Sequence, residues 1–97
     1  MVKGIRIEPN SVTIHDYADD LETLQNEVGG KIDMITLPDG GVMIVDLEFG
    51  LKNYPLNENA SAVAGMAIGG IALIFGRDGD RLADVPEWYM PLLELGE

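Results

Sequence analysis

The chain has 97 residues, and 17 Asp and Glu against 6 Lys and Arg give it a formal net charge of −11 at pH 7. A surface this acidic repels nucleic acid and anionic membranes, and it attracts basic protein surfaces or cations. The lack of cysteine excludes disulfides and thiolate chemistry. With His15 as the only histidine, a His-based triad or His-rich metal site within one chain is excluded as well.

The first elements read as strands followed by a helix. Apolar and polar residues alternate over residues 4–9, which predicts a strand, and again over residues 12–15, either as a second short strand or as its continuation past a bend. Four apolar residues then follow at helical spacing: Tyr17, Leu21, Leu24 and Val28. Asp19 with Glu22 fits a capping box, and Gly29 with Gly30 ends the helix.

The middle of the chain predicts a β-hairpin. Its strands are residues 31–37 and 42–48, and the turn between them contains one proline and two glycines. In the second strand we expect Met43, Val45 and Leu47 to face the core, with Asp46 and Glu48 on the other face.

An irregular stretch over residues 51–56 leads to a helix over residues 58–66, capped by Asn57 or Asn59. Residues 67–75 predict a central strand with a bulge at its paired glycines. A charged loop over residues 77–81 follows, and then a partly helical end over residues 86–95, interrupted by Pro91.

Two observations favour a soluble cytoplasmic domain. No apolar segment follows Lys3, so nothing resembles a signal peptide. Residues 60–76 lack charge, but the segment is short, contains four glycines and has no basic flank, which favours a short helix running into a buried strand over a membrane span.

Together these elements predict a single acidic α+β domain over residues 1–97. We expect a mixed, mostly antiparallel sheet of four to five strands with two or three helices packed on one face. The strand over residues 67–75 is apolar on both sides, so it should occupy an inner position beside the hairpin.

Five acidic residues on and before the first helix form the candidate partner-binding surface: Asp16, Asp19, Asp20, Glu22 and Glu27. They lie mostly on the face away from the apolar stripe. The surface could imitate the phosphate line of DNA and occupy a basic groove of another protein. A solvated helix face explains the same pattern.

Four polar or amphipathic side chains in the irregular stretch form the candidate ligand-binding site: Lys52, Asn53, Tyr54 and Asn57. Loops of this kind often carry binding groups. Turn formation by the Asn and Pro residues is the structural alternative.

The sequence contains no complete motif for a catalytic or metal-binding site. His15 beside Asp16 could be a general base, but neither of the two serines has a nucleophile-elbow context. Asp78 and Asp80 resemble only a fragment of a calcium loop, because the remaining ligands are missing. We therefore expect no catalytic residues, no metal and no cofactor.

Three segments in this order resemble a small domain-of-unknown-function family of bacteriophages, plasmids and other mobile elements. They are Gly29-Gly30-Lys31-Ile32-Asp33, Leu51-Lys52-Asn53-Tyr54-Pro55-Leu56-Asn57 and Ile68-Gly69-Gly70. The resemblance covers residues 5–85. It implies a viral or mobile-element origin and action in the host cytoplasm, and it brings no established activity.

The resulting expectation is a non-enzymatic, phage-encoded interaction protein that binds or inhibits a host protein through its acidic surface, as a DNA mimic or an anti-defence factor. The alternative is a small-ligand binder, such as a sponge for a nucleotide signal. No direct binding of nucleic acid or membrane is expected, and a homodimer is plausible because a small sheet has exposed edges.

Overall fold

The structure is a computed structural model and describes residues 1–95. Its elements, in chain order, are β1 (Val2–Glu8), β2 (Ser11–Tyr17), α1 (Leu21–Val28), β3 (Ile32–Thr36), β4 (Val42–Asp46), α2 (Glu58–Ala64), β5 (Ala72–Asp78), β6 (Arg81–Ala83) and the 3-10 helix η1 (Glu87–Leu95).

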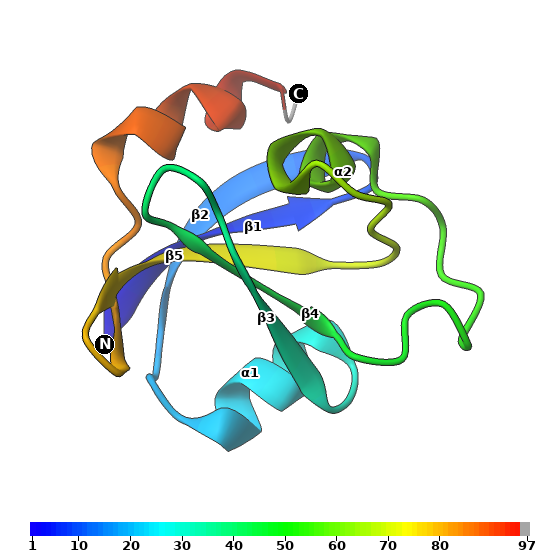
Figure 1. Cartoon of the computed structure of the whole chain (residues 1–97), viewed down its shortest axis with the longest axis horizontal. Helices are drawn as coiled ribbons and strands as arrows, with labels where there is room; N and C mark the ends of the chain where they lie inside the picture. Colours follow the sequence, from blue (N-terminus) through cyan, green and yellow to red (C-terminus); the bar gives the residue numbers. More distant parts are fainter. Residues whose placement is uncertain (96–97) are drawn as a thin grey trace.

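The strands form one antiparallel sheet in the order β2-β1-β5-β4-β3, with β6 paired to β5 (Figure 1). β5 lies between the two hairpins, because Ile74 pairs with Ile5 of β1 on one side and with Met43 of β4 on the other. The predicted inner position of this apolar segment, beside the hairpin, is therefore confirmed.

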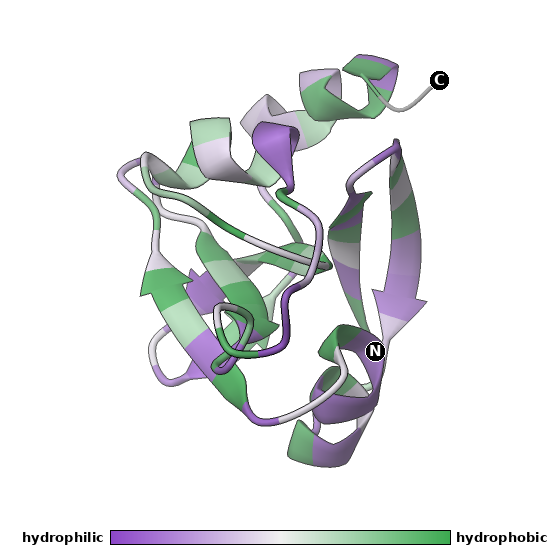
Figure 2. Ribbon diagram, turned by 90° about the vertical axis from the view of Figure 1, so that its right-hand side faces the viewer, coloured by the Kyte–Doolittle hydropathy of each residue, from purple (hydrophilic) through white to green (hydrophobic). Residues whose placement is uncertain are grey.

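Both faces of the sheet are covered by helices. On one face, alternate residues of the inner strands pack against α2 and η1. On the opposite face, Leu73 and Phe75 pack against Leu24 and Val28 of α1. Figure 2 shows α1 on one side of the sheet and α2 with η1 on the other. Each fully buried aliphatic or aromatic side chain contributes roughly 1.5–3 kcal/mol, so both faces contribute to stability.

The expected arrangement of the sheet and helices is wrong, although the α+β composition holds. Within the described residues the sheet has six strands, all antiparallel, and the helices are not confined to one face. β4 and β5 are apolar on both sides, so each face needs a cover. Residues 77–81, expected to be a charged loop, instead complete the hairpin of β5 and β6 around Gly79.

The first helix is confirmed, but its start is not the expected one. The cap is Asp20, whose side chain accepts from the backbone of Thr23, and the predicted pairing of Asp19 with Glu22 is absent from this cap. Tyr17 belongs to β2, which is a full second strand, and its ring still packs with the buried side chains of α1.

The second helix and the strand after it also differ in their limits. α2 is capped by Asn57 and ends at Gly65. β5 begins at Ala72, and before it only Gly69 forms a bridge, with Leu56. Leu47 was expected in the core, but it is 53% exposed because β4 ends one residue earlier.

None of the helices within residues 1–95 has the length and apolarity needed to cross a membrane.

Candidate functional site

The acidic side chains expected to bind a partner surround the junction between β2 and α1. Asp16 lies near the end of β2, and Asp19 and Asp20 lie in the connection. Glu22 lies in the first turn of α1 and Glu27 in its last. The structure exposes the first four on one short segment, residues 16–22, whereas Glu27 is half-buried.

Asp20 also has a structural role as the N-cap of α1. Its Oδ1 accepts a hydrogen bond of 2.7 Å from the N–H of Thr23, which caps α1. This hydrogen bond holds the pKa of Asp20 below its ordinary value. The charge therefore remains at the helix N-terminus, where the backbone dipole favours it. Asn is an equally good cap, so Asp20→Asn removes the charge and keeps the hydrogen bond.

Basic side chains neutralise little of the segment at residues 16–22. Lys3 Nζ lies 3.9 Å from Asp16 Oδ1, and both side chains are about half exposed (49% and 62%). Exposed pairs of this kind contribute about 0–1 kcal/mol. Among the residues that the structure describes, Asp19, Asp20 and Glu22 form no ion pair. Their negative charge is available to a partner.

Glu27 differs from the other four because its charge is paired inside the fold. Arg6 donates from Nη1 to Glu27 Oε1, and its Nε lies 3.4 Å from Glu8 Oε2. Burial of the guanidinium lowers its pKa, but the two carboxylates outweigh burial and raise the pKa of Arg6 above its usual value. The pair ties the end of α1 to β1.

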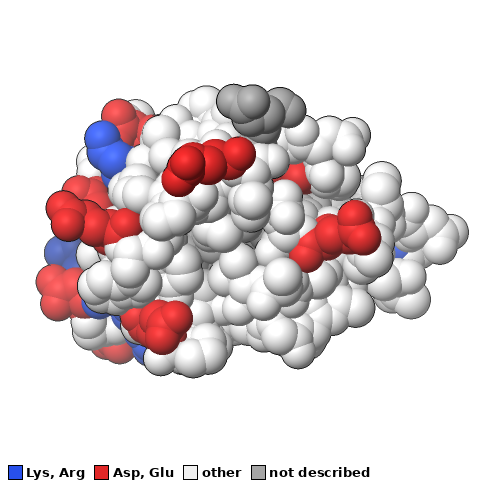
Figure 3. All heavy atoms as spheres, turned by 90° about the horizontal axis from the view of Figure 1, so that it is seen from above, with Lys and Arg blue, Asp and Glu red and all other residues white. Residues whose placement is uncertain are grey.

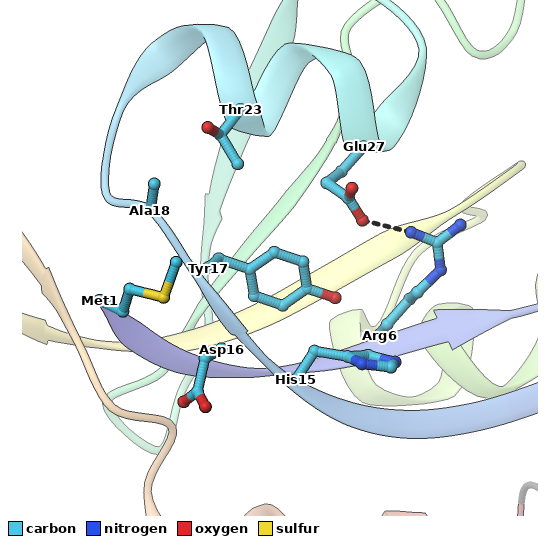
Figure 4. Close-up of a pocket in the computed structure, with 8 residues that line it drawn as sticks. All are labelled: Met1, Arg6, His15, Asp16, Tyr17, Ala18, Thr23 and Glu27. Carbon is cyan, nitrogen blue, oxygen red and sulfur yellow. Dashed lines mark hydrogen bonds and ion pairs between the residues drawn. The ribbon is translucent and has the colours of Figure 1, made fainter.

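A hollow of about 540 Å³ opens beside this ion pair (Figure 4). The residues that line it are Met1, Arg6, His15, Asp16, Tyr17, Ala18, Thr23 and Glu27. The Tyr17 hydroxyl points toward Arg6 and Glu27 in Figure 4, and it is buried without a hydrogen-bond partner among the described residues. Burial raises the pKa of Tyr17, and the charge of Glu27 raises it further, so the phenol stays protonated at neutral pH.

His15, considered from the sequence as a base oriented by Asp16, has a different neighbour. Its Nε2 lies 2.9 Å from Thr13 Oγ1. Its ring stands edge to face with Tyr17, with 6.0 Å between the centroids. The hollow thus offers a guanidinium, carboxylates, a phenol and an imidazole that can contact a ligand or a side chain.

A second hollow, of about 350 Å³, lies on the other side of the segment, between α1, β3 and the β5–β6 hairpin. Its centre is apolar, with Leu21 57% exposed and Met34 51% exposed. Charged residues surround it: Asp19 and Asp20 beside α1, and Arg77, Asp80 and Arg81 on the hairpin. An apolar centre within a charged rim is the usual composition of a protein-binding surface.

The residues expected to bind a small ligand lie in the loop before α2: Lys52, Asn53, Tyr54 and Asn57. The structure turns the polar groups of two of them onto one buried carboxylate. Lys52 Nζ donates to Asp46 Oδ2 (2.8 Å), and the Tyr54 hydroxyl donates to the same oxygen (3.0 Å).

Asp46 lies on the expected face of β4, opposite Met43 and Val45, but that face is also buried, beneath α1. It is 1% exposed, and its Oδ1 accepts from the N–H of Glu48. Burial would raise the pKa of Asp46, but the hydrogen bonds from Lys52, the Glu48 backbone and Tyr54 outweigh burial and lower it. The signal that could have identified it is its position at the end of a strand that is apolar on both faces.

Asn57 is fully buried and joins three parts of the fold. Its Nδ2 donates to the carbonyl oxygens of Ile7 and Gly70, each at 2.8 Å, and its Oδ1 accepts from the N–H of Ala60 at the start of α2. Asn53, by contrast, is exposed and has a φ of 54°, in the left-handed region. Asn57 therefore has a structural role, and Asn53 forms a turn.

The glycine segments of the family-like pattern meet this loop. A Cβ at Gly70 would lie 2.6 Å from Tyr54 Cδ2, and one at Gly30 would lie 2.6 Å from Lys52 Nζ. Side chains at these glycines would displace the ring and the ammonium group. Tyr54 and Gly70 also border a further hollow of about 450 Å³, next to the end of α1.

Within residues 1–95, no group of three or more His, Cys, Asp or Glu side chains is placed to hold a metal ion. Asp78 and Asp80, the fragment of a calcium-like loop, flank the turn at Gly79. Arg77 donates to the carbonyl oxygen of Gly79 in this turn.

A family model described as "Domain of unknown function (DUF3846)" matches residues 2–94 of the chain. Comparison with curated proteins gave no match, and comparison with solved structures gave none either.

Proposed function

The chain belongs to the DUF3846 family, a domain of unknown function, and we propose its role from its own surface: it is a non-enzymatic protein that binds a basic surface of a partner protein through residues 16–22. The observation that carries this proposal is that basic side chains neutralise little of the negative charge of these residues. Asp16, Asp19, Asp20 and Glu22 are exposed together, and within residues 1–95 their one ion pair is the weak contact of Asp16 with Lys3.

Four carboxylates on so short a segment repel one another, so a cationic partner would relieve this repulsion on binding. The net charge of −11 adds a long-range field that speeds the approach of a basic protein. The adjoining hollow supplies an apolar centre, with Leu21 and Met34 half exposed. Charge would direct the encounter, and burial of these side chains would slow dissociation.

The experiment compares two variants with the same loss of charge. The first carries Asp16→Asn, Asp19→Asn, Asp20→Asn and Glu22→Gln. The second neutralises four exposed acids elsewhere: Asp39→Asn, Asp78→Asn, Glu87→Gln and Glu94→Gln. A partner captured by the unaltered protein from a host lysate is purified and titrated against each variant at several salt concentrations.

We expect the first variant to bind at least roughly tenfold more weakly and to lose most of the salt dependence, because the contacts that respond to ionic strength are removed. The second variant should keep an affinity within about threefold. Equal affinities for both variants would sink the proposal, provided that circular dichroism shows both to be folded.

The setting of this interaction is also part of the proposal. The resemblance of the three glycine- and asparagine-bearing segments to a mobile-element family supports a phage-encoded protein that acts on a protein of the host cytoplasm. A DNA-mimicking or anti-defence role fits a surface that competes for a basic groove.

The small-ligand alternative has one observation in its favour, the hollow beside Tyr54. Protein binding is better supported by the geometry. Lys52 and Tyr54 are hydrogen-bonded to Asp46, and the amide of Asn57 is used by backbone groups, so these polar groups are already engaged.

A further inference from the structure

β3 is the last strand on one side of the sheet, and β4 is its only partner among the described strands. Figure 1 shows β3 at the front of the molecule, and Figure 2 shows it along the outer margin. The opposite edge strand, β2, is different because η1 packs against it. β3 therefore presents the more open edge.

Two backbone hydrogen bonds fix which groups of β3 face outward. The N–H of Leu37 donates to the carbonyl of Gly41, and the N–H of Leu47 donates to the carbonyl of Lys31. Both pairs have the register of β3 with β4, so the odd-numbered residues of β3 exchange hydrogen bonds with β4. The N–H and C=O groups of Ile32, Met34 and Thr36 consequently point away from the sheet.

The side chains beside this edge favour strand addition. Met34 projects on the α1 face and, with Leu21, forms the exposed apolar centre of the second hollow. Asp33 is exposed on the opposite face of the same strand. β3 itself contains no proline and no lysine, which commonly protect a free edge from pairing, and Lys31 and Pro38 stand only beyond its ends.

The charge around β3 favours a basic segment over a second copy of the chain as the strand that pairs with it. A second copy would bring another chain of net charge −11 to this edge and would place the Asp33 side chains of both copies near the joint. An extended segment with basic side chains meets the opposite situation, because Asp33 lies on one face and Asp19 and Asp20 border the other. Basic side chains are also present: Lys31 precedes β3, and Arg77 and Arg81 lie with Asp80 on the hairpin side of the hollow. The acids outnumber these basic side chains by four to three.

We propose that β3 binds an extended segment of the partner as an additional antiparallel strand, with apolar side chains against Met34 and Leu21 and basic side chains beside Asp33. This inference rests on the proposed function, because it states how the basic partner docks. Main-chain hydrogen bonds to Ile32, Met34 and Thr36 would supply affinity, and the alternating side chains would supply specificity.

The test uses a synthetic peptide of about eight residues that alternates valine and lysine and has blocked ends, a length sufficient for strand addition. Amide hydrogen exchange is measured with and without the peptide. We expect exchange at Ile32, Met34 and Thr36 to slow by roughly tenfold or more, while exchange at Asp33 and Ile35, already bonded to β4, changes little.

A matched pair of variants separates the backbone from the side chain. Thr36→Pro removes one outward N–H at an exposed edge position where proline is tolerated, and Thr36→Val keeps that N–H. The proline variant should bind the peptide about tenfold more weakly, and the valine variant should bind within about twofold of the unaltered protein. A peptide with N-methylated valines makes the same comparison without changing the protein.

Each outcome separates the two proposals. If the peptide binds but the three amides are not protected, strand addition is wrong and charge-based binding remains. If the peptide does not bind, or if sedimentation shows a dimer that Thr36→Pro dissociates, the basic-segment proposal is wrong. If the amides are protected equally in the variant neutralised at residues 16–22, the edge binds without the acidic segment, and the proposed function is wrong.

Discussion

At the scale of single residues, the chain uses its polar side chains in two ways. Asp16, Asp19 and Glu22 face solvent, whereas Asp46 and Asn57 are buried and fully engaged in hydrogen bonds. A buried polar group that loses its partners lowers the free energy of unfolding by about 1–3 kcal/mol. Substitutions of Asp46 or Asn57 should therefore destabilise the fold. The exposed acids carry no such constraint, because water solvates their charges.

The first prediction concerns Asp46 and pH. Its pKa is lowered in the folded protein, so its contribution to stability is fully present above the unfolded value of about 3.9 and is lost as the pH falls through the folded value. We expect Asp46→Asn to reduce the free energy of unfolding at pH 7 by about 2 kcal/mol, because the charge-assisted hydrogen bonds to Lys52 and Tyr54 weaken.

Urea unfolding at pH 7 and at a pH of about 3 measures this effect, and the difference between the two proteins should shrink at the lower pH. Asp33→Asn is the control, since Asp33 is exposed. A difference that is as large in acid as at neutral pH would show that Asp46 stabilises by shape and not by charge.

At the scale of elements, three short segments far apart in the chain meet around one ring. The end of α1 approaches Tyr54 at Gly29, the loop before α2 carries the ring, and the segment before β5 approaches it at Gly70. Gly70 has a φ of +76° and no room for a side chain, because a Cβ would lie 2.6 Å from the ring. Conformation and packing both require glycine here.

Gly65 allows the two requirements to be separated. Its φ is +73°, close to that of Gly70, but a Cβ added there would meet no atom within 4 Å. Gly65→Ala should therefore cost only backbone strain, about 1 kcal/mol, whereas Gly70→Ala should cost about 3 kcal/mol because the Tyr54 ring must also move. Thermal or urea unfolding of both variants gives the comparison, and equal losses would exclude the packing explanation.

Much of the fold could be predicted at this scale, because local patterns determine local structure. The first two strands, the central hairpin and the cap at Asn57 follow from alternation and turn residues. The hairpin at residues 77–81 was missed, since its charged side chains look like a loop and its pairing depends on β5. The placement of helices on both faces was missed because a single sequence does not state which face each stripe meets.

In the candidate site, too, the sequence predicts what is local in the chain and misses contacts between distant residues. The acidic segment could be read directly from the sequence, because a cluster of charges close in the chain stays close in space. The contacts of Asp46 with Lys52 and Tyr54, and of Arg6 with Glu27, could not, because they depend on which strands become neighbours.

At the scale of the whole molecule, charge is unevenly distributed. Figure 3, which looks onto the side of α2 and η1, shows charged side chains gathered toward the end that holds the β5–β6 hairpin, while much of the remaining face is uncharged. Seventeen carboxylates on so small a body repel one another, and this repulsion opposes the compact state.

We therefore expect salt to stabilise the protein. Raising ionic strength from about 0.01 M to about 0.15 M shortens the screening length from about 30 Å to about 8 Å, so repulsion across the surface weakens. The midpoint of thermal unfolding should rise by several degrees, roughly the effect of 1 kcal/mol on a domain of this size. The variant neutralised at residues 16–22 should show a smaller rise, and a midpoint that falls with salt would contradict this account.

The position of β5 also governs the order in which the molecule can be assembled. The central strand of the sheet comes from the last third of the chain, and the two hairpins that flank it are synthesised first. On the ribosome these hairpins cannot join until β5 emerges and inserts between them, so the backbone groups at their inner edges stay unpaired until then. The nascent domain is thus exposed to aggregation until β5 has been synthesised.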